Sequence, residues 1–127
     1  MSARPLLIDA SALTAFIRKE PGGERVLKSL TTARREHLVS DGTFTPEQVR
    51  TRIRQLGQLL TVIPFEVSVQ RAASFYSARR KPYDLSLGDA LCLGTAEVLG
   101  ADVMTAEQNW ATLPNLPFGV ELIRGEA

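Results

Sequence analysis

The sequence predicts an α/β protein with a mostly parallel central sheet and helices on both faces. Short apolar or β-branched runs alternate along the chain with longer stretches whose apolar residues recur at helical spacing. Gly, Pro and polar clusters separate these runs, and the sequence contains no repeat or low-complexity segment. Strands that alternate with helices pair in parallel through right-handed crossovers, so we expect helices to cover both faces of one sheet.

The first third of the chain predicts two strands and two helices. Residues 5–8 form a short apolar run, and residues 11–19 follow with apolar side chains at helical spacing. A Pro-Gly-Gly break at 21–23 separates this helix from a second amphipathic helix over residues 26–33. Residues 37–40, with the sequence HLVS, predict a short buried strand.

The middle of the chain predicts helix, strand and helix. A Thr-Pro pair, suited to the cap and first position of a helix, opens a helical stretch over residues 45–57 that ends at a glycine. The β-branched run LLTVIPF at 59–65 is typical of a strand, and a helix is expected from 67 to 80. We expect a turn at 81–84, where the sequence is KPYD.

The last third predicts one long helix and two short strands. Ser86 is suited to begin a helix, and Gly100 follows its last apolar residue, where a left-handed backbone is often needed. Residues 101–105 then predict a strand, residues 107–113 a short helix, and residues 120–123 a last or edge strand.

Composition excludes several classes of protein. The 127 residues fit a single domain over 1–127, and 44% hydrophobic with 23% charged residues is typical of a chain that folds alone. No apolar stretch approaches the ~20 residues that cross a bilayer, so we expect a cytoplasmic protein. The single Cys92 lies in an apolar run, which favours a reduced, packed thiol. A net charge of +1 leaves nucleic-acid binding to local basic clusters or metal ions.

Three acidic residues occupy positions where α/β sheets place functional sites. Asp9 ends the first expected strand, Asp89 lies in the first turn of a helix, and Glu107 follows the strand at 101–105. Clustered carboxylates repel one another unless one is protonated or a hard cation such as Mg²⁺ or Mn²⁺ binds. Such a cation supports phosphodiester hydrolysis without a Ser, Cys or His nucleophile, which suits a chain with one histidine.

Each of these acids also has an ordinary structural interpretation. Asp9 can cap the helix that follows it, and Asp89 can form a capping box with Ser86. Glu107 can favour the positive end of its own short helix. Spacing alone leaves both interpretations open.

The segments LLIDASAL, YDLSLGDALCLGTAEVLGADVMTAEQNW and VELIR resemble the VapC-type toxins of the PIN-domain superfamily. Asp9, Asp89 and Glu107 stand at the positions of that family's motifs D-x-S, L-S-x-x-D-A-x-C-L and T-A-D-x-x-W. The resemblance implies a PIN-like three-layer domain and a Mg²⁺- or Mn²⁺-dependent ribonuclease. It also implies a homodimer and an antitoxin that covers the active-site cleft. Ser11 would hold the metal-site carboxylates by hydrogen bonds, the alternative being that it caps the first helix.

The chain departs from the family in two places. Glu107 stands where the family usually has Asp, which moves the carboxylate outward by one methylene. One helix, which in the family carries a second catalytic Glu, is missing between Ser40 and Thr45. Glu47 is the nearest substitute as a metal ligand and Asp41 the next, although a Glu in the first turn of a helix is common. We therefore expect RNA cleavage by this chain to be weak or absent.

Two clusters of basic residues are candidates for contact with RNA phosphates. Arg50 and Arg54 lie one turn apart on a helix, and Arg79 and Arg80 belong to a basic run before the expected turn. Each cluster can equally be a solvated surface. Neither would read a base sequence, because RNA specificity usually comes from stacking and edge contacts to unpaired bases.

Two functions from different classes remain open. The first is a metal-dependent endoribonuclease that acts as the toxin of a type II toxin–antitoxin pair. The second is a degenerate PIN domain that has lost hydrolysis and binds RNA or an antitoxin. A phosphoacceptor receiver domain is disfavoured, because the strand LLTVIPF lacks the acceptor Asp that this class requires.

Overall fold

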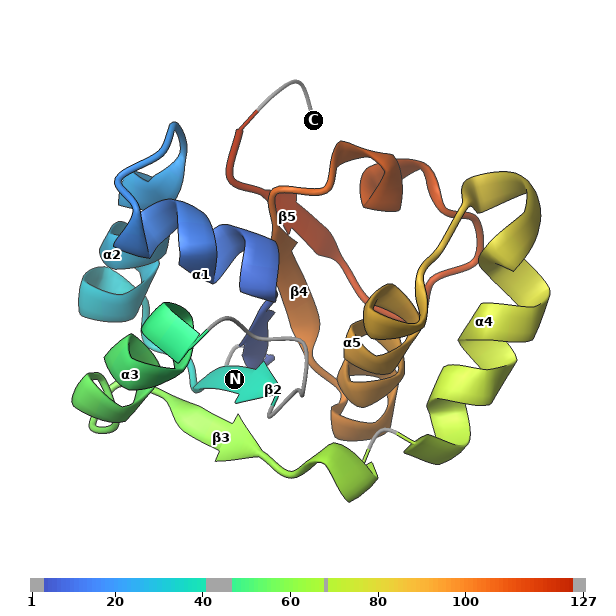
Figure 1. Cartoon of the computed structure of the whole chain (residues 1–127), viewed down its shortest axis with the longest axis horizontal. Coiled ribbons are helices and arrows are strands. Elements are labelled where there is room, and N and C mark those ends of the chain that lie inside the picture. The colour runs from blue at the N-terminus through green and yellow to red at the C-terminus, as the bar shows by residue number, and fades with distance from the viewer. Residues whose placement is uncertain (1–3, 41–46, 68, 125–127) are drawn as a thin grey trace.

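The computed structural model describes residues 4–40, 47–67 and 69–124, and it contains a five-stranded sheet with the strand order β3-β2-β1-β4-β5. All four strand pairs are parallel, which confirms the predicted sheet (Figure 1). The strands are β1 (Leu6–Ile8), β2 (His37–Ser40), β3 (Thr61–Ile63), β4 (Asp102–Thr105) and β5 (Val120–Leu122).

Helices cover the two faces of this sheet and complete three layers (Figure 1). On one face lie α1 (Ala10–Ile17), α2 (Gly23–Thr32) and α3 (Glu47–Gln55); on the other lie α4 (Val69–Tyr83) and α5 (Leu87–Leu99). Two short 3-10 helices follow β3 and β4, η1 (Phe65–Val67) and η2 (Gln108–Thr112). Within the described ranges, no helix is long and apolar enough to cross a membrane.

The central strand β1 is buried on both faces. Leu7 packs into the hydrophobic core beneath α4 and α5, whereas Leu6 and Ile8 pack into the core beneath α1 and α2. Successive side chains of a strand point to opposite faces, so a strand covered on both sides reads as a continuous apolar run. This explains why the first strand of the sequence has no polar alternation.

The turn expected at 81–84 was wrong, because α4 continues to Tyr83 and includes Pro82. Tyr83 packs against the core beneath α4 and α5. This packing offsets the backbone hydrogen bond that a proline cannot donate. The helix ends at Tyr83, and Asp84, which follows it, has a left-handed backbone with φ 54°. The Thr-Pro pair expected to open α3 and Asp41 lie outside the described residues.

Helix α5 begins and ends as its sequence predicts. Ser86 and Asp89 form a capping box, in which the Ser86 side chain accepts from the Asp89 amide and the Asp89 side chain accepts from the Ser86 amide. Gly100 ends the helix in the left-handed region with φ 62°. The capping box fixes where the Asp89 carboxyl group lies at the start of α5.

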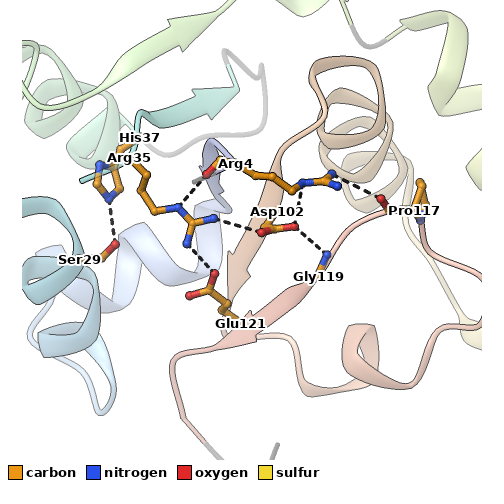
Figure 2. Close-up of polar contacts among 8 residues, drawn as sticks. All are labelled: Arg4, Ser29, Arg35, His37, Asp102, Pro117, Gly119 and Glu121. Atoms are coloured by element: carbon orange, nitrogen blue, oxygen red, sulfur yellow. Dashed lines mark hydrogen bonds and ion pairs between the residues drawn. The ribbon is translucent and has the colours of Figure 1, made fainter. Parts of the chain in front are cut away.

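A network of ion pairs ties together the amino ends of the strands (Figure 2). Arg35, whose side chain is only 15% exposed, contacts Asp102 at 3.2 Å and Glu121 at 2.9 Å. Its Nε also donates to the backbone oxygen of Arg4 at 2.9 Å, and the Arg4 guanidinium lies 3.3 Å from Asp102. Asp102 further accepts from the Gly119 amide at 2.9 Å. These contacts stabilise the edge of the sheet opposite the three acidic residues.

Candidate active site

Asp9 lies where β1 passes into α1, and its carboxylate is held by hydrogen bonds on one oxygen. Oδ2 accepts from the Ser11 amide at 3.2 Å, from the Ser11 hydroxyl, and from the Thr105 hydroxyl at 3.0 Å. Asp9 is the N-cap of α1, which confirms the capping role expected for it and makes Ser11 a partner of Asp9 instead of the cap. The orientation of this carboxylate is therefore determined by both β1 and β4.

Thr105 is a component of this site that the sequence did not reveal as one. It is fully buried at the end of β4, and its hydroxyl accepts from the Glu107 amide at 3.0 Å while it donates to Asp9. Ser11 contributes a parallel link, since its hydroxyl accepts from the Ala106 amide at 3.0 Å. In the sequence, the only indication of this role was that Thr105 carries a hydroxyl group and lies two residues before Glu107. Recognising its role required knowing that β1 and β4 are neighbours.

Asp89 lies in the first turn of α5, next to Asp9. Burial is the largest cause that raises the pKa of Asp89, while the hydrogen bonds of Ser86 lower it and the charges of Asp9 and Asp84 raise it further. Asp84, in the link between α4 and α5, is thus a further acid near Asp89, and it was not among the residues predicted from the sequence. The carboxyl groups of Asp9 and Asp89 are close enough to repel each other.

Glu107 precedes η2 and makes no side-chain capping hydrogen bond with it. Partial desolvation is the largest cause that raises its pKa, followed by the charges of Asp89 and Asp9, whereas Arg124 lowers it. The same two acids that the motif pairs with Glu107 therefore act on it electrostatically. Asp9 ends β1, Asp89 lies in the first turn of α5 and Glu107 follows β4, and the charges of the two aspartates act on Glu107.

The donor chemistry of this cluster suits a hard divalent cation. Carboxylate oxygens are the preferred ligands of Mg²⁺ and Mn²⁺, and the mutual repulsion of the three acids is what such a cation relieves. As the side chains stand, the described part of the chain contains no group of three His, Cys, Asp or Glu residues arranged to hold one ion. Metal ligation by these three residues stays a prediction.

Cys92 packs behind the acidic cluster as a buried, free thiol, as predicted. Burial is the main cause that raises the pKa of this thiol, and the charge of Asp9, a hydrogen bond with Asp9 and the charge of Asp89 raise it further. The neutral thiol is therefore strongly favoured. A thiolate nucleophile at this position is disfavoured for the same reason.

Glu47, the expected substitute for the missing acid, is exposed at the first position of α3. Its role in binding a metal stays a prediction.

The predicted RNA-binding arginines differ in what surrounds them. Arg54 is exposed and donates to the Thr51 hydroxyl at 3.3 Å. The Arg79 guanidinium lies 4.7 Å from the ring centroid of Phe75, and it also donates to the carbonyl of Pro114 at 3.4 Å. Arg79 thus joins α4 to the segment after η2. The side chains of Arg50 and Arg80 lie outside the described residues, and RNA contact stays a prediction for all four arginines.

Comparison with known proteins supports the fold. No family model and no curated protein sequence matches the chain. Among solved structures, it is similar to a chain of DNA-bound VapBC from Salmonella typhimurium, with a TM-score of 0.63, 15% identity, and coverage of 96% of this chain and 100% of that chain. The chain has the PIN-domain fold.

Two further solved structures share this fold. A chain of VapBC2 from Rickettsia felis, bound to a promoter DNA fragment, matches with a TM-score of 0.62 and 14% identity over 93% of this chain and 98% of that chain. FitAcB from Neisseria gonorrhoeae contains a chain that matches with a TM-score of 0.57 and 16% identity over 91% and 96%. In each case the two chains align over nearly their whole lengths.

Proposed function

We propose that this PIN domain is a divalent-cation-dependent endoribonuclease that acts as the toxin of a type II toxin–antitoxin pair. The observation that supports the proposal is that the Thr105 hydroxyl links the Asp9 carboxylate to the Glu107 amide, while the charges of Asp9 and Asp89 act on the Glu107 carboxyl group. Solved structures that share this fold include a toxin–antitoxin complex from Klebsiella pneumoniae, which supports the toxin role.

In this proposal the three acids hold Mg²⁺ or Mn²⁺, and Ser11 and Thr105 keep the Asp9 carboxylate in position. The cation would stabilise negative charge on the phosphodiester during hydrolysis. Ser11 and Thr105 restrain Asp9 by donating to its Oδ2. Restraint of this kind matters because the partners of metal ligands usually set their orientation and affinity.

We further propose that an antitoxin protein covers the carboxyl edge of the sheet in the resting state, and that the toxin is a homodimer in the cytoplasm. Both statements rest on the family resemblance. Co-expression with the protein encoded by the neighbouring gene, followed by light scattering, tests them. A chain that stays monomeric and co-purifies with no partner would count against this part of the proposal.

A degenerate PIN domain that binds RNA or an antitoxin without cleaving RNA is the second candidate. In the described chain one helix, α3, lies between β2 and β3. The family resemblance calls for two helices there, the first carrying a catalytic Glu. A site with one ligand fewer would bind its cation and position the attacking water less well, so rates can fall by orders of magnitude.

Calorimetric titration with Mn²⁺ tests the metal site directly. We expect the parent to bind, and we expect Asp9→Asn and Asp89→Asn each to abolish or greatly weaken binding. Glu36→Gln is the matched control, because it removes one exposed carboxylate directly before β2, at the opposite edge of the sheet. If both aspartate variants bind like the parent, the capping roles are sufficient and the metal site is wrong. Mg²⁺-dependent cleavage of RNA then separates the nuclease from the degenerate domain.

A further inference from the structure

Arg124, the residue that follows β5 by two positions, lies beside the acidic cluster. Leu122 pairs with Thr105, and the Ile123 amide donates to the Thr105 carbonyl at 3.0 Å. Continuing this parallel register by two residues from the Leu122–Thr105 pair places Arg124 alongside Glu107. Its positive charge acts on the Glu107 carboxyl group, which agrees with that placement.

The turn between α1 and α2 holds Arg124 in this position. The Arg124 guanidinium donates to the Pro21 carbonyl at 2.8 Å, and Arg25 donates to the Leu122 carbonyl at 2.9 Å. Gly22 has φ 91°, and a Cβ atom added there would lie 2.5 Å from the Ile123 oxygen and 3.1 Å from the Arg124 Cβ. Only glycine therefore allows the turn to approach this closely. The backbone of Arg124 is fixed, while its side chain remains partly exposed.

If the substrate of the site is a phosphodiester, a positively charged side chain such as that of Arg124 is needed beside the three acids. Three carboxylates repel a phosphate, and the net charge of +1 creates no broad attractive field. A guanidinium offers several N–H groups in a planar fork that matches phosphate oxygens, and the bond to Pro21 uses only one of them. By contrast, the Arg79 guanidinium packs over Phe75 and donates to the carbonyl of Pro114.

We propose that Arg124 binds an RNA backbone phosphate next to Asp9, Asp89 and Glu107. This inference rests on the proposed ribonuclease function and adds a substrate-binding residue to it. The contact is to the phosphate alone, so it is independent of base sequence. Any unstructured RNA therefore serves as a probe.

Fluorescence anisotropy with a fluorescein-labelled oligouridylate tests the proposal in a chain carrying Asp9→Asn, which prevents cleavage during the titration. We expect Arg124→Gln to weaken binding about tenfold. The slope of log affinity against log salt should become shallower by about 0.7, the value for one phosphate contact with a single strand. Arg34→Gln is the control, because it removes the same charge from an exposed residue between α2 and β2. It should change both quantities much less.

Arg124→Lys keeps the charge, so the salt slope should stay near that of the Asp9→Asn chain while the loss of the planar fork still weakens binding. Thermal unfolding shows which variants are folded. If Arg124→Gln does not fold, the RNA affinity of Arg124→Lys tests the proposal in its place. Folded Arg124 variants that bind no more weakly than Arg34→Gln would overturn this inference alone. A parent chain that neither binds nor cleaves RNA would overturn the proposed function together with it.

Discussion

Thr105→Val tests whether the buried hydroxyl at the end of β4 organises the acidic site. Valine has nearly the same shape, so the change removes the hydroxyl without opening a large cavity. The hydroxyl donates to Asp9 at 3.0 Å and accepts from the Glu107 amide at 3.0 Å. Losing a hydrogen bond to a charged group costs about 1.5–3 kcal/mol, and leaving the Glu107 amide without its acceptor adds to this. Because Ser11 still donates to Asp9, we expect the free energy of unfolding to fall by about 2–3 kcal/mol.

Thr95→Val is the matched control for that measurement. Thr95 is also fully buried, but its hydroxyl donates to the Leu91 carbonyl one turn earlier in α5. The Leu91 carbonyl also accepts the backbone hydrogen bond of the helix, so it keeps a partner when the Thr95 hydroxyl is removed. We therefore expect Thr95→Val to lower the free energy of unfolding by under about 1 kcal/mol. Urea unfolding followed by circular dichroism compares the two variants, and calorimetry should show Mn²⁺ binding about 10–100-fold weaker in Thr105→Val alone. Equal losses of stability in both variants, with unchanged Mn²⁺ affinity, would refute the organising role of Thr105.

Two further predictions concern Glu47 and His37. We expect Glu47→Gln to leave Mg²⁺-dependent RNA cleavage nearly unchanged, since Glu47 is exposed in the first turn of α3, where a Glu commonly has only a structural role. A loss of cleavage as large as that of Asp89→Asn would show that Glu47 has replaced the missing acid. His37 is buried against the Ser29 hydroxyl, and burial, then the charge of Arg35, lowers its pKa from 6.5 while Glu121 raises it. A lowered folded-state pKa contributes stability above pH 6.5 that is lost as the pH falls through the folded value. Urea midpoints measured across this range should therefore fall less steeply in His37→Gln than in the parent, and identical slopes would contradict this.

The sequence by itself determined most of the local structure and the positions of the acids. Helix α5 could be predicted at both ends, because its capping box and its left-handed glycine depend only on residues close in the chain. The strand β2 coincides with the buried run HLVS. Asp9, Asp89 and Glu107 were found because each directly follows a strand or opens a helix, which is a local property.

Only the tertiary structure decided how distant segments meet. The bond between Thr105 and Asp9 depends on β1 and β4 being neighbours, and strand order is not encoded in hydrophobic periodicity. The same holds for Arg124, whose position beside Glu107 follows from the pairing of β5 with β4. Likewise, α4 extends beyond its expected end because Tyr83 finds a place in the core, and this packing outweighs the local preference of proline for a turn. In each case an interaction between residues far apart in sequence overrode, or added to, what short-range preferences could specify.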